Sequence, residues 1–179
     1  MSPEQALRGY FHAKDENRPH LLDDVFASDA RLEIRNRSGQ INFPAVTVGL
    51  AEIADVLVRR FNQAYENIYS FYLNRPGSTD EVFSCDWLVG MTEKESRSIR
   101  VGWGRYEWTF QREPVLQVTQ LIITIEAMLA LDPPATTKVM RWLTELDYPW
   151  TSAAAVTRAL PLAELEPVCR YVGRENVSK

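Results

Sequence analysis

The sequence has little cysteine and little histidine, and it contains no long apolar run. Cys85 and Cys169 are the only cysteines among 179 residues, which is too few for a disulfide framework or a structural zinc site. No apolar run approaches the about 18–20 residues that a membrane-spanning helix requires, and no charged leader precedes an apolar block at the N-terminus. The sequence therefore predicts a reducing, cytoplasmic location with no membrane span and no metal.

An excess of basic charge is also missing. The chain has 20 Lys and Arg against 24 Asp and Glu, for a net charge of −4, whereas nucleic-acid-binding domains usually carry a basic patch. The adjacent pair Arg59 and Arg60 falls on the polar side of a predicted helix. We therefore predict no nucleic-acid partner. The 45% apolar and 25% charged residues are typical of a globular domain large enough to bury its own core.

The sequence does contain a helical first part followed by a strand-rich part. Ser2 and Gln5 form a capping-box pattern at the start of a helix over residues 2–15. A helix over 19–26, a strand over 30–35, an extended segment over 41–48 and a helix over 49–65 follow, and then strands over 67–73, 81–91, 97–111 and 115–128. This order predicts an α+β domain over residues 1–128. Residues 129–179, here called the C-terminal extension, read as short helices packed on the same domain.

Several phrases in fixed order resemble one superfamily. They are "GYF" at 9–11, "FASDA" at 26–30, "GLAEIADVLVRRF" at 49–61, "RYEWTF" at 105–110 and "VTQLIITIE" at 118–126. Together they resemble the nuclear transport factor 2-like superfamily, in particular its SnoaL-like members, over roughly residues 3–127. The resemblance implies a cone: a curved antiparallel or mixed sheet wrapped around three helices, with an internal apolar pocket and a homodimer through the outer sheet face. Its members include ketosteroid isomerases, polyketide cyclases, scytalone dehydratase and limonene epoxide hydrolase, so the fold assigns no reaction.

The resemblance to ketosteroid isomerases makes Tyr10 the candidate catalytic residue. In those enzymes a tyrosine of the first helix donates a hydrogen bond to the developing enolate, and such a donor stabilises charge that appears only in the transition state. Tyr10 also fits a core position beside Phe11, and the sequence leaves both readings open. The isomerase general base corresponds to Ile34, which accepts no proton, and strand alternation turns Glu33 to the opposite face. A second donor of those enzymes corresponds to Tyr106, so donors are present where a base is not.

The predicted pocket is apolar and binds a small lipophilic or aromatic molecule without a cofactor. Its predicted lining is Tyr10, Ile34, Phe61, Tyr69, Cys85, Trp87 and Tyr106. Two functions follow from this lining. The first is a cofactor-free isomerase, dehydratase or cyclase that uses Tyr10 as donor, and the second is a non-catalytic ligand-binding or dimerisation module. The C-terminal extension is predicted to cover the pocket mouth or to extend the dimer interface.

The remaining polar residues of the first 34 positions are expected at the surface. His12 and His20 are separated by a helix break and have no metal-ligand spacing. The carboxylates Asp15, Glu16, Asp23, Asp24 and Asp29 are expected in turns, caps and the polar side of a helix. Arg105, Glu107 and Glu126 resemble the Arg/Asp pairs of limonene epoxide hydrolase only faintly.

The long strands give three further expectations. Alternation places Phe83, Cys85, Trp87, Val89 and Met91 on one inward face, and Asp86 outside, where Arg105 can pair with it. A three-residue turn at 112–114 would pair Phe110 with Leu116, Trp108 with Val118 and Tyr106 with Gln120. Alternation leaves open whether this aromatic face lines the pocket or a dimer interface.

Overall fold

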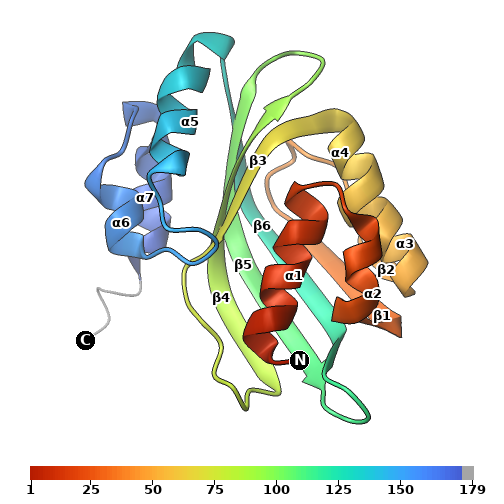
Figure 1. Ribbon diagram of the computed structural model, residues 1–179. Helices are drawn as coiled ribbons and strands as arrows, with labels where there is room; N and C mark the ends of the chain where they lie inside the picture. The colour runs from red at the N-terminus through yellow and green to blue at the C-terminus, as the bar shows by residue number, and fades with distance from the viewer. Residues whose placement is uncertain (175–179) are drawn as a thin grey trace.

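A single curved sheet of six strands organises the protein, for which we describe residues 1–174 of a computed structural model (Figure 1). The strands are β1 (Phe26–Asn36), β2 (Val46–Val48), β3 (Tyr65–Tyr72), β4 (Val82–Glu93), β5 (Ile99–Gln111) and β6 (Gln117–Leu131). Their order across the sheet is β2-β1-β6-β5-β4-β3. The pairing of β1 with β6 is parallel and the others are antiparallel. The α+β class and the curved mixed sheet predicted from the sequence are confirmed.

Helices from the first part of the chain cover the inner face of this sheet. They are α1 (Pro3–Asp15), η1 (Pro19–Leu21), α2 (Leu22–Val25), α3 (Leu50–Ala54), the π-helical η2 (Asp55–Arg60) and α4 (Phe61–Ala64). The last three run on from one another as the helix predicted over 49–65. The predicted capping box is present, because the Ser2 amide donates to Gln5 Oε1 at 2.8 Å and the Gln5 amide donates to Ser2 Oγ at 3.2 Å. Within residues 1–174 no helix is long and apolar enough to cross a bilayer.

The inner core fills the space between these helices and the sheet. The predicted inward face of β4 is confirmed, because Phe83, Cys85, Trp87, Val89 and Met91 all belong to this core. The aromatic face of β5 lies in it as well, with Tyr106 5% and Trp108 0% exposed. The structure thus resolves the alternative that the sequence left open: this face points into the cone.

The predicted register of the β5–β6 hairpin is wrong. Phe110 lies opposite Val118, Trp108 opposite Leu121 and Tyr106 opposite Ile123. The connection extends beyond 112–114, because β5 ends at Gln111 and β6 begins at Gln117. A bulge between Thr109 and Phe110 then adds one residue to β6. Turn length and bulges set the register of a hairpin, and alternation alone does not report them.

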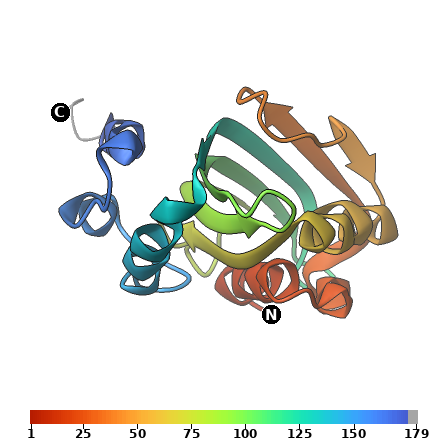
Figure 2. The same ribbon diagram turned by 90° about the horizontal axis from the view of Figure 1, so that it is seen from above.

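The C-terminal extension packs on the opposite, outer face of the sheet. Its helices are η3 (Pro133–Ala135), α5 (Thr136–Thr144), α6 (Ala153–Arg158), η4 (Ala163–Leu165) and α7 (Glu166–Val172). Figures 1 and 2 show them on the side of the sheet away from α1 to α4. A second core forms there between Phe71, Leu88, Val101 and Trp103 of the strands and apolar side chains of the helices. The sheet therefore separates two apolar layers.

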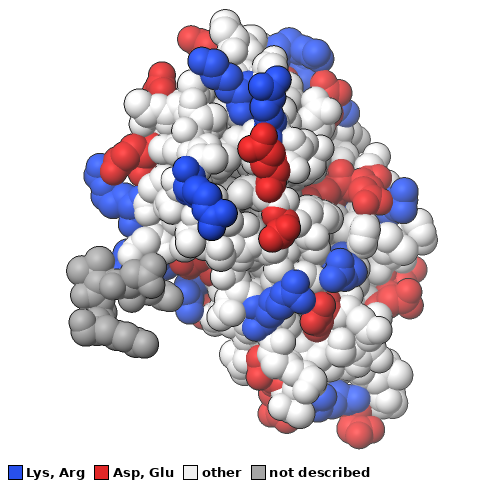
Figure 3. All heavy atoms as spheres, turned by 60° about the vertical axis from the view of Figure 1, so that its left-hand side comes forward, with Lys and Arg blue, Asp and Glu red and all other residues white. Residues whose placement is uncertain are grey.

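Close contacts fit the extension to the sheet. A Cβ atom at Gly90 would lie 2.1 Å from Leu143 Cδ1, so a side chain at this position would displace Leu143 of α5. The predicted pair of Asp86 and Arg105 is confirmed at 3.4 Å, and Arg174 also donates to both Asp86 oxygens at 2.7 and 2.8 Å. On the face that Figure 3 shows, basic and acidic side chains lie interspersed.

We expect Leu143→Ala to lower the free energy of unfolding by about 2–5 kcal/mol, because it leaves a cavity in the outer core. Leu143 is 0% exposed and contacts the sheet at Gly90. Chemical denaturation measures the change. Lys138→Ala, at an exposed position of the same helix, is the control and should stay within about 0.5 kcal/mol of the parent protein. Equal stability of the two variants would contradict a packed outer layer.

Candidate ligand-binding site

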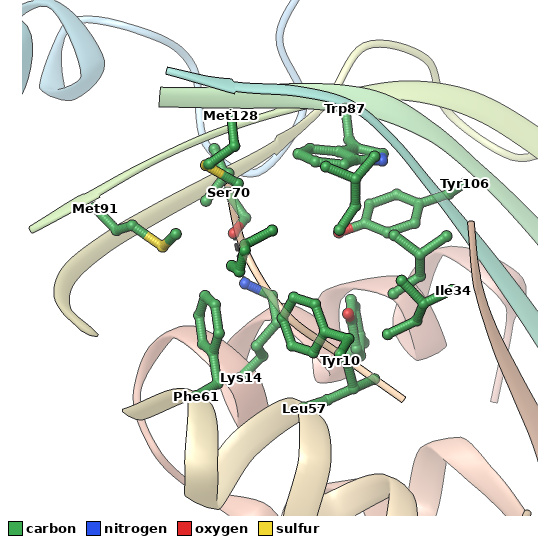
Figure 4. Close-up of a pocket in the computed structure, with 15 residues that line it drawn as sticks. Tyr10, Lys14, Ile34, Leu57, Phe61, Ser70, Trp87, Met91, Tyr106 and Met128 are labelled. Atoms are coloured by element: carbon green, nitrogen blue, oxygen red, sulfur yellow. Dashed lines mark hydrogen bonds between the residues drawn. The ribbon is translucent and has the colours of Figure 1, made fainter. Parts of the chain in front are cut away.

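A small cavity lies between the helices and the inner face of the sheet (Figure 4). Its volume is about 50 Å³. The lining side chains come from α1, the helix over 50–64, the loop before β2 and all of the long strands. They are Tyr10, Lys14, Ile34, Ile41, Phe43, Leu57, Phe61, Ser70, Trp87, Val89, Met91, Tyr106, Ile123, Ile125 and Met128. Five of the seven residues that the sequence suggested are among them: Tyr10, Ile34, Phe61, Trp87 and Tyr106.

Tyr69 and Cys85 do not reach this cavity. The register of β3 shifts between Glu66 and Tyr69, and Tyr69 packs against the outer core, beneath the C-terminal helices. Cys85 does face inward and is 3% exposed, but other core side chains surround it. Burial raises the pKa of the Cys85 thiol, which disfavours the thiolate that a nucleophile needs.

Tyr10 lies at the centre of an aromatic cluster in the wall of the cavity. Its ring makes edge contacts with Tyr106 at 6.1 Å and Trp108 at 5.1 Å between centroids. Its hydroxyl is buried, and no residue of 1–174 offers it a partner at normal hydrogen-bond distance and angle; the Tyr106 hydroxyl lies close by as a weaker contact. Burial raises the pKa of Tyr10, and the nearby Tyr106 hydroxyl acts in the opposite direction. Tyr10 is therefore both a core aromatic and a neutral donor without a well-placed partner.

The charged residue of the cavity, Lys14, and its buried partner Asp15 were not predicted from the sequence. Lys14 Nζ lines the cavity, and it donates to Asp15 Oδ1 at 2.5 Å and to Ser70 Oγ at 2.7 Å. The side chains of Lys14 and Asp15 are only 7% and 3% exposed. Asp15 was expected at the surface, and that expectation is wrong because α1 ends against β3, where Ser70 meets its carboxylate. A signal was present: Lys14 follows Leu7 and Phe11 on one stripe of the helix.

Four further hydrogen bonds hold Lys14 and Asp15 in place. The Asn62 side chain donates to the Lys14 carbonyl oxygen at 2.8 Å and to the Val58 carbonyl oxygen at 2.9 Å. It thereby satisfies a carbonyl in the last turn of α1, which has no partner within the helix, and ties α1 to the helix over 50–64. Asp15 Oδ2 accepts from the Ser70 amide at 3.0 Å and from the Tyr148 hydroxyl, in the C-terminal extension, at 3.5 Å. Burial raises the pKa of Asp15, while Lys14 and Ser70 act in the opposite direction.

Several hydrogen-bond donors therefore lie in the cavity wall. Lys14, Tyr10 and Tyr106 point into the space between sheet and helices (Figure 4). The lining includes neither a carboxylate nor an imidazole. Among the described lining residues only Lys14 could act as a base, and only after its ammonium group has lost a proton. The position of the isomerase base, Ile34, is apolar as expected, and Glu33 faces away, where it accepts from Arg35 at 2.8 Å.

The other polar candidates lie outside the cavity. His12 Nδ1 is 2.8 Å from Glu16 Oε1 on the flank of α1, and His20 is exposed. Glu107 and Glu126 pair with Arg35 and Arg37 on the outer side of the sheet. Within residues 1–174 there is no group of His, Cys, Asp and Glu side chains that could hold a metal ion.

The cavity adjoins a groove on the surface. Ile41, Phe43 and Phe61 line both spaces, and the rings of Phe43 and Phe61 stack at 6.4 Å between centroids. The groove has a volume of about 180 Å³ and also includes Arg60 and Tyr65. None of the residues that line either space comes from the described part of the C-terminal extension. The helices of residues 133–172 lie on the outer face of the sheet and do not cover this cavity. The other alternative, that the extension contributes to a dimer interface, stays a prediction.

Comparison with known proteins shows the fold. No protein-family profile and no curated protein sequence matches the chain. Several solved structures match the chain in fold. Hexachlorocyclohexane dehydrochlorinase LinA-type3 from Novosphingobium barchaimii is 12% identical over 70% of this chain and 85% of its own, with a TM-score of 0.55. A nuclear transport factor 2-like protein from Salmonella enterica is 12% identical over 72% and 87%, with a TM-score of 0.55.

A third similar structure was solved with a ligand. It is a hypothetical protein with a ketosteroid isomerase-like fold from Catenulispora acidiphila, in complex with trimethylamine. It is 15% identical over 69% of this chain and 85% of its own, with a TM-score of 0.53. The chain thus has the nuclear transport factor 2-like cone fold that its sequence resembles. Proteins with this fold include isomerases and dehydrochlorinases.

We expect Tyr10→Phe to leave the free energy of unfolding unchanged or to raise it, because the variant removes a buried hydroxyl that has no well-placed partner among residues 1–174. Tyr72→Phe is the matched comparison: the Tyr72 hydroxyl is equally buried but donates to the Leu7 carbonyl oxygen at 3.0 Å, so its loss should cost about 0.5–1.5 kcal/mol. Denaturation by urea measures both variants. If Tyr10→Phe lowers the free energy of unfolding as much as Tyr72→Phe does, the Tyr10 hydroxyl makes a structural hydrogen bond.

Proposed function

We propose that the cavity binds a small apolar molecule that carries one hydrogen-bond acceptor, such as a carbonyl oxygen. The observation that supports this function is the Lys14 amine, a charged donor in the wall of an otherwise apolar cavity. A buried cation is costly unless it is paired and hydrogen-bonded. Lys14 has partners in Asp15 and Ser70, yet it still lines the cavity, where an acceptor on the ligand can reach it.

The size of the cavity limits the ligand. About 50 Å³ compares with the about 10–15 Å³ that one water molecule needs on the same kind of measure. This volume suits a molecule of a few heavy atoms. A cavity that binds benzene has about 150 Å³, so a six-membered ring such as cyclohexanone requires side chains of the cavity wall to move outward. A molecule as large as a steroid requires the side chains of Ile41, Phe43 and Phe61, between the cavity and the groove, to move outward. The groove beyond them can take a longer substituent.

Cofactor-free catalysis is the second candidate function, and the donor arrangement favours it. Lys14, Tyr10 and Tyr106 could together stabilise negative charge on a ligand oxygen, as preorganised donors do in a site from which water is excluded. Isomerisation, dehydration and cyclisation each also need a proton acceptor. Lys14 is the one lining residue able to serve, provided that its proton passes to Asp15.

A homodimer through the sheet face stays a prediction, and the structure narrows the surface that it can use. The C-terminal helices cover the outer face over β3, β4 and part of β5. The rest of that face carries the ion pairs of Arg35 with Glu33 and Glu107, and of Arg37 with Glu126. We propose that a dimer would form through this polar half, so that the extension takes the place of part of the usual interface.

The binding proposal predicts a preference for an acceptor on a ligand of fixed size. Cyclohexanone should raise the melting temperature more than methylcyclohexane does, because only the ketone accepts a hydrogen bond from Lys14. Lys14→Met should remove the difference between the two compounds. Differential scanning fluorimetry at matched free ligand concentrations makes the measurement.

A cavity-filling variant locates the site. Val89→Phe places a larger side chain in the cavity and should abolish the response to both compounds. Val82 lies on the same strand and is 65% exposed. The Val82→Phe variant should therefore show the same thermal shifts with the two compounds as the parent protein. Undiminished binding to the Val89 variant would overturn the proposed site.

A further inference from the structure

We propose that Lys14 is a nucleophile that forms an imine with a small aldehyde or ketone in the cavity. The inference rests on the proposed function and deepens it, because it names the class of ligand and the bond that forms. It is carried by the juxtaposition of a cavity-lining amine, a buried carboxylate and a bridging hydroxyl at Lys14, Asp15 and Ser70.

The position of the amine meets the first requirement of such chemistry. Lysines that attack carbonyl groups are typically desolvated in apolar pockets. The Lys14 side chain is 7% exposed, and its nitrogen lies 5.0 Å from the centre of the Phe61 ring and 5.5 Å from that of Phe11. Figure 4 shows it beside Ser70 at the edge of the cavity. Within the described chain no other lysine lines this space.

The second requirement is a group that takes a proton from the ammonium and later returns it. Asp15 Oδ1 lies 2.5 Å from Lys14 Nζ, and Ser70 Oγ accepts from Lys14 at 2.7 Å while it donates to Asp15 at 2.9 Å. Transfer of one proton from Lys14 to Asp15 leaves a neutral amine beside a neutral carboxylic acid. Burial raises the pKa of Asp15, which favours the proton on its carboxyl group.

The steps then balance without a cofactor. The neutral nitrogen attacks the carbonyl carbon, and a proton moves from nitrogen to the new alkoxide to give a carbinolamine. The Asp15 carboxylic acid protonates the carbinolamine hydroxyl, water leaves, and a protonated imine remains beside the restored carboxylate. Tyr10, whose buried hydroxyl has no well-placed partner among residues 1–174, can donate to the carbonyl oxygen during the attack.

The arrangement also explains why an ion pair is buried here at all. Replacing a buried ion pair by apolar side chains of similar volume is often neutral or stabilising, so stability alone is a weak reason to keep one. Tyr148 of the C-terminal extension covers Asp15 from outside, with its ring 6.5 Å from that of Phe11. The carboxylate thus exchanges protons with Lys14 and Ser70 rather than with bulk water.

Reductive trapping tests the inference. The full-length protein is incubated with propanal, the imine is reduced with sodium borohydride, and peptide mapping by mass spectrometry measures the alkylation of Lys14, Lys94, Lys138 and Lys179. At limiting aldehyde concentration we expect the alkylated fraction of Lys14 to be about tenfold higher than that of the other lysines, because its amine is desolvated. Asp15→Asn should slow the trapping at Lys14, and Val89→Phe should block it, while Val82→Phe should leave it unchanged.

The alkylation of Lys14 is compared with that of the other lysines in the parent protein, so the result does not depend on whether a variant folds. If the alkylated fraction of Lys14 is equal to or lower than that of Lys94, the proposal of imine formation at Lys14 is wrong. If cyclohexanone still raises the melting temperature in that case, the binding function stands and Lys14 acts only as a hydrogen-bond donor. If Lys14 is not alkylated and cyclohexanone does not raise the melting temperature, the proposed binding function is wrong as well.

Discussion

The buried contact between Lys14 and Asp15 is the constraint on which the candidate site depends. It requires α1 to end against β3, because Ser70 supplies both its amide and its hydroxyl to the carboxylate. It also requires the helix over 50–64 to contact α1, because Asn62 binds the Lys14 carbonyl oxygen. An unpaired charge at this depth would be strongly unfavourable, so these elements must assemble together. The polar end of the cavity is therefore as firmly placed as its apolar walls.

The sheet supports this site by being buried on both faces. Its inner face supplies the aromatic wall of the cavity, and its outer face packs against the helices of the C-terminal extension. Segment 148–151 joins the two sides: the Thr151 amide donates to the Tyr72 carbonyl oxygen at 2.9 Å, and the Tyr72 amide donates to the Pro149 carbonyl oxygen at 2.8 Å. A strand edge that would otherwise be open is thereby covered, and Tyr148 is brought to Asp15.

Local patterns were sufficient for much of the fold. The capping box at Ser2, the inward alternation of β4 and the order of the elements all appear in the structure as the sequence predicted them. These features depend on residues within a few positions of one another, so periodicity and turn chemistry report them. The β5–β6 register was mispredicted, because the connection between the strands is longer than three residues and a bulge between Thr109 and Phe110 shifts the pairing further.

The cone fold, its apolar interior and the inward positions of Tyr10 and Tyr106 were predictable from the sequence. The place at which charge enters that interior depends on tertiary contacts. Asp15 is an ordinary helix-terminal carboxylate until β3 places Ser70 against it, and Lys14 becomes part of a cavity wall only when Phe61 and the sheet close around its amine. Whether a charge is buried depends on contacts between segments far apart in the chain, and helical periodicity describes only one of those segments.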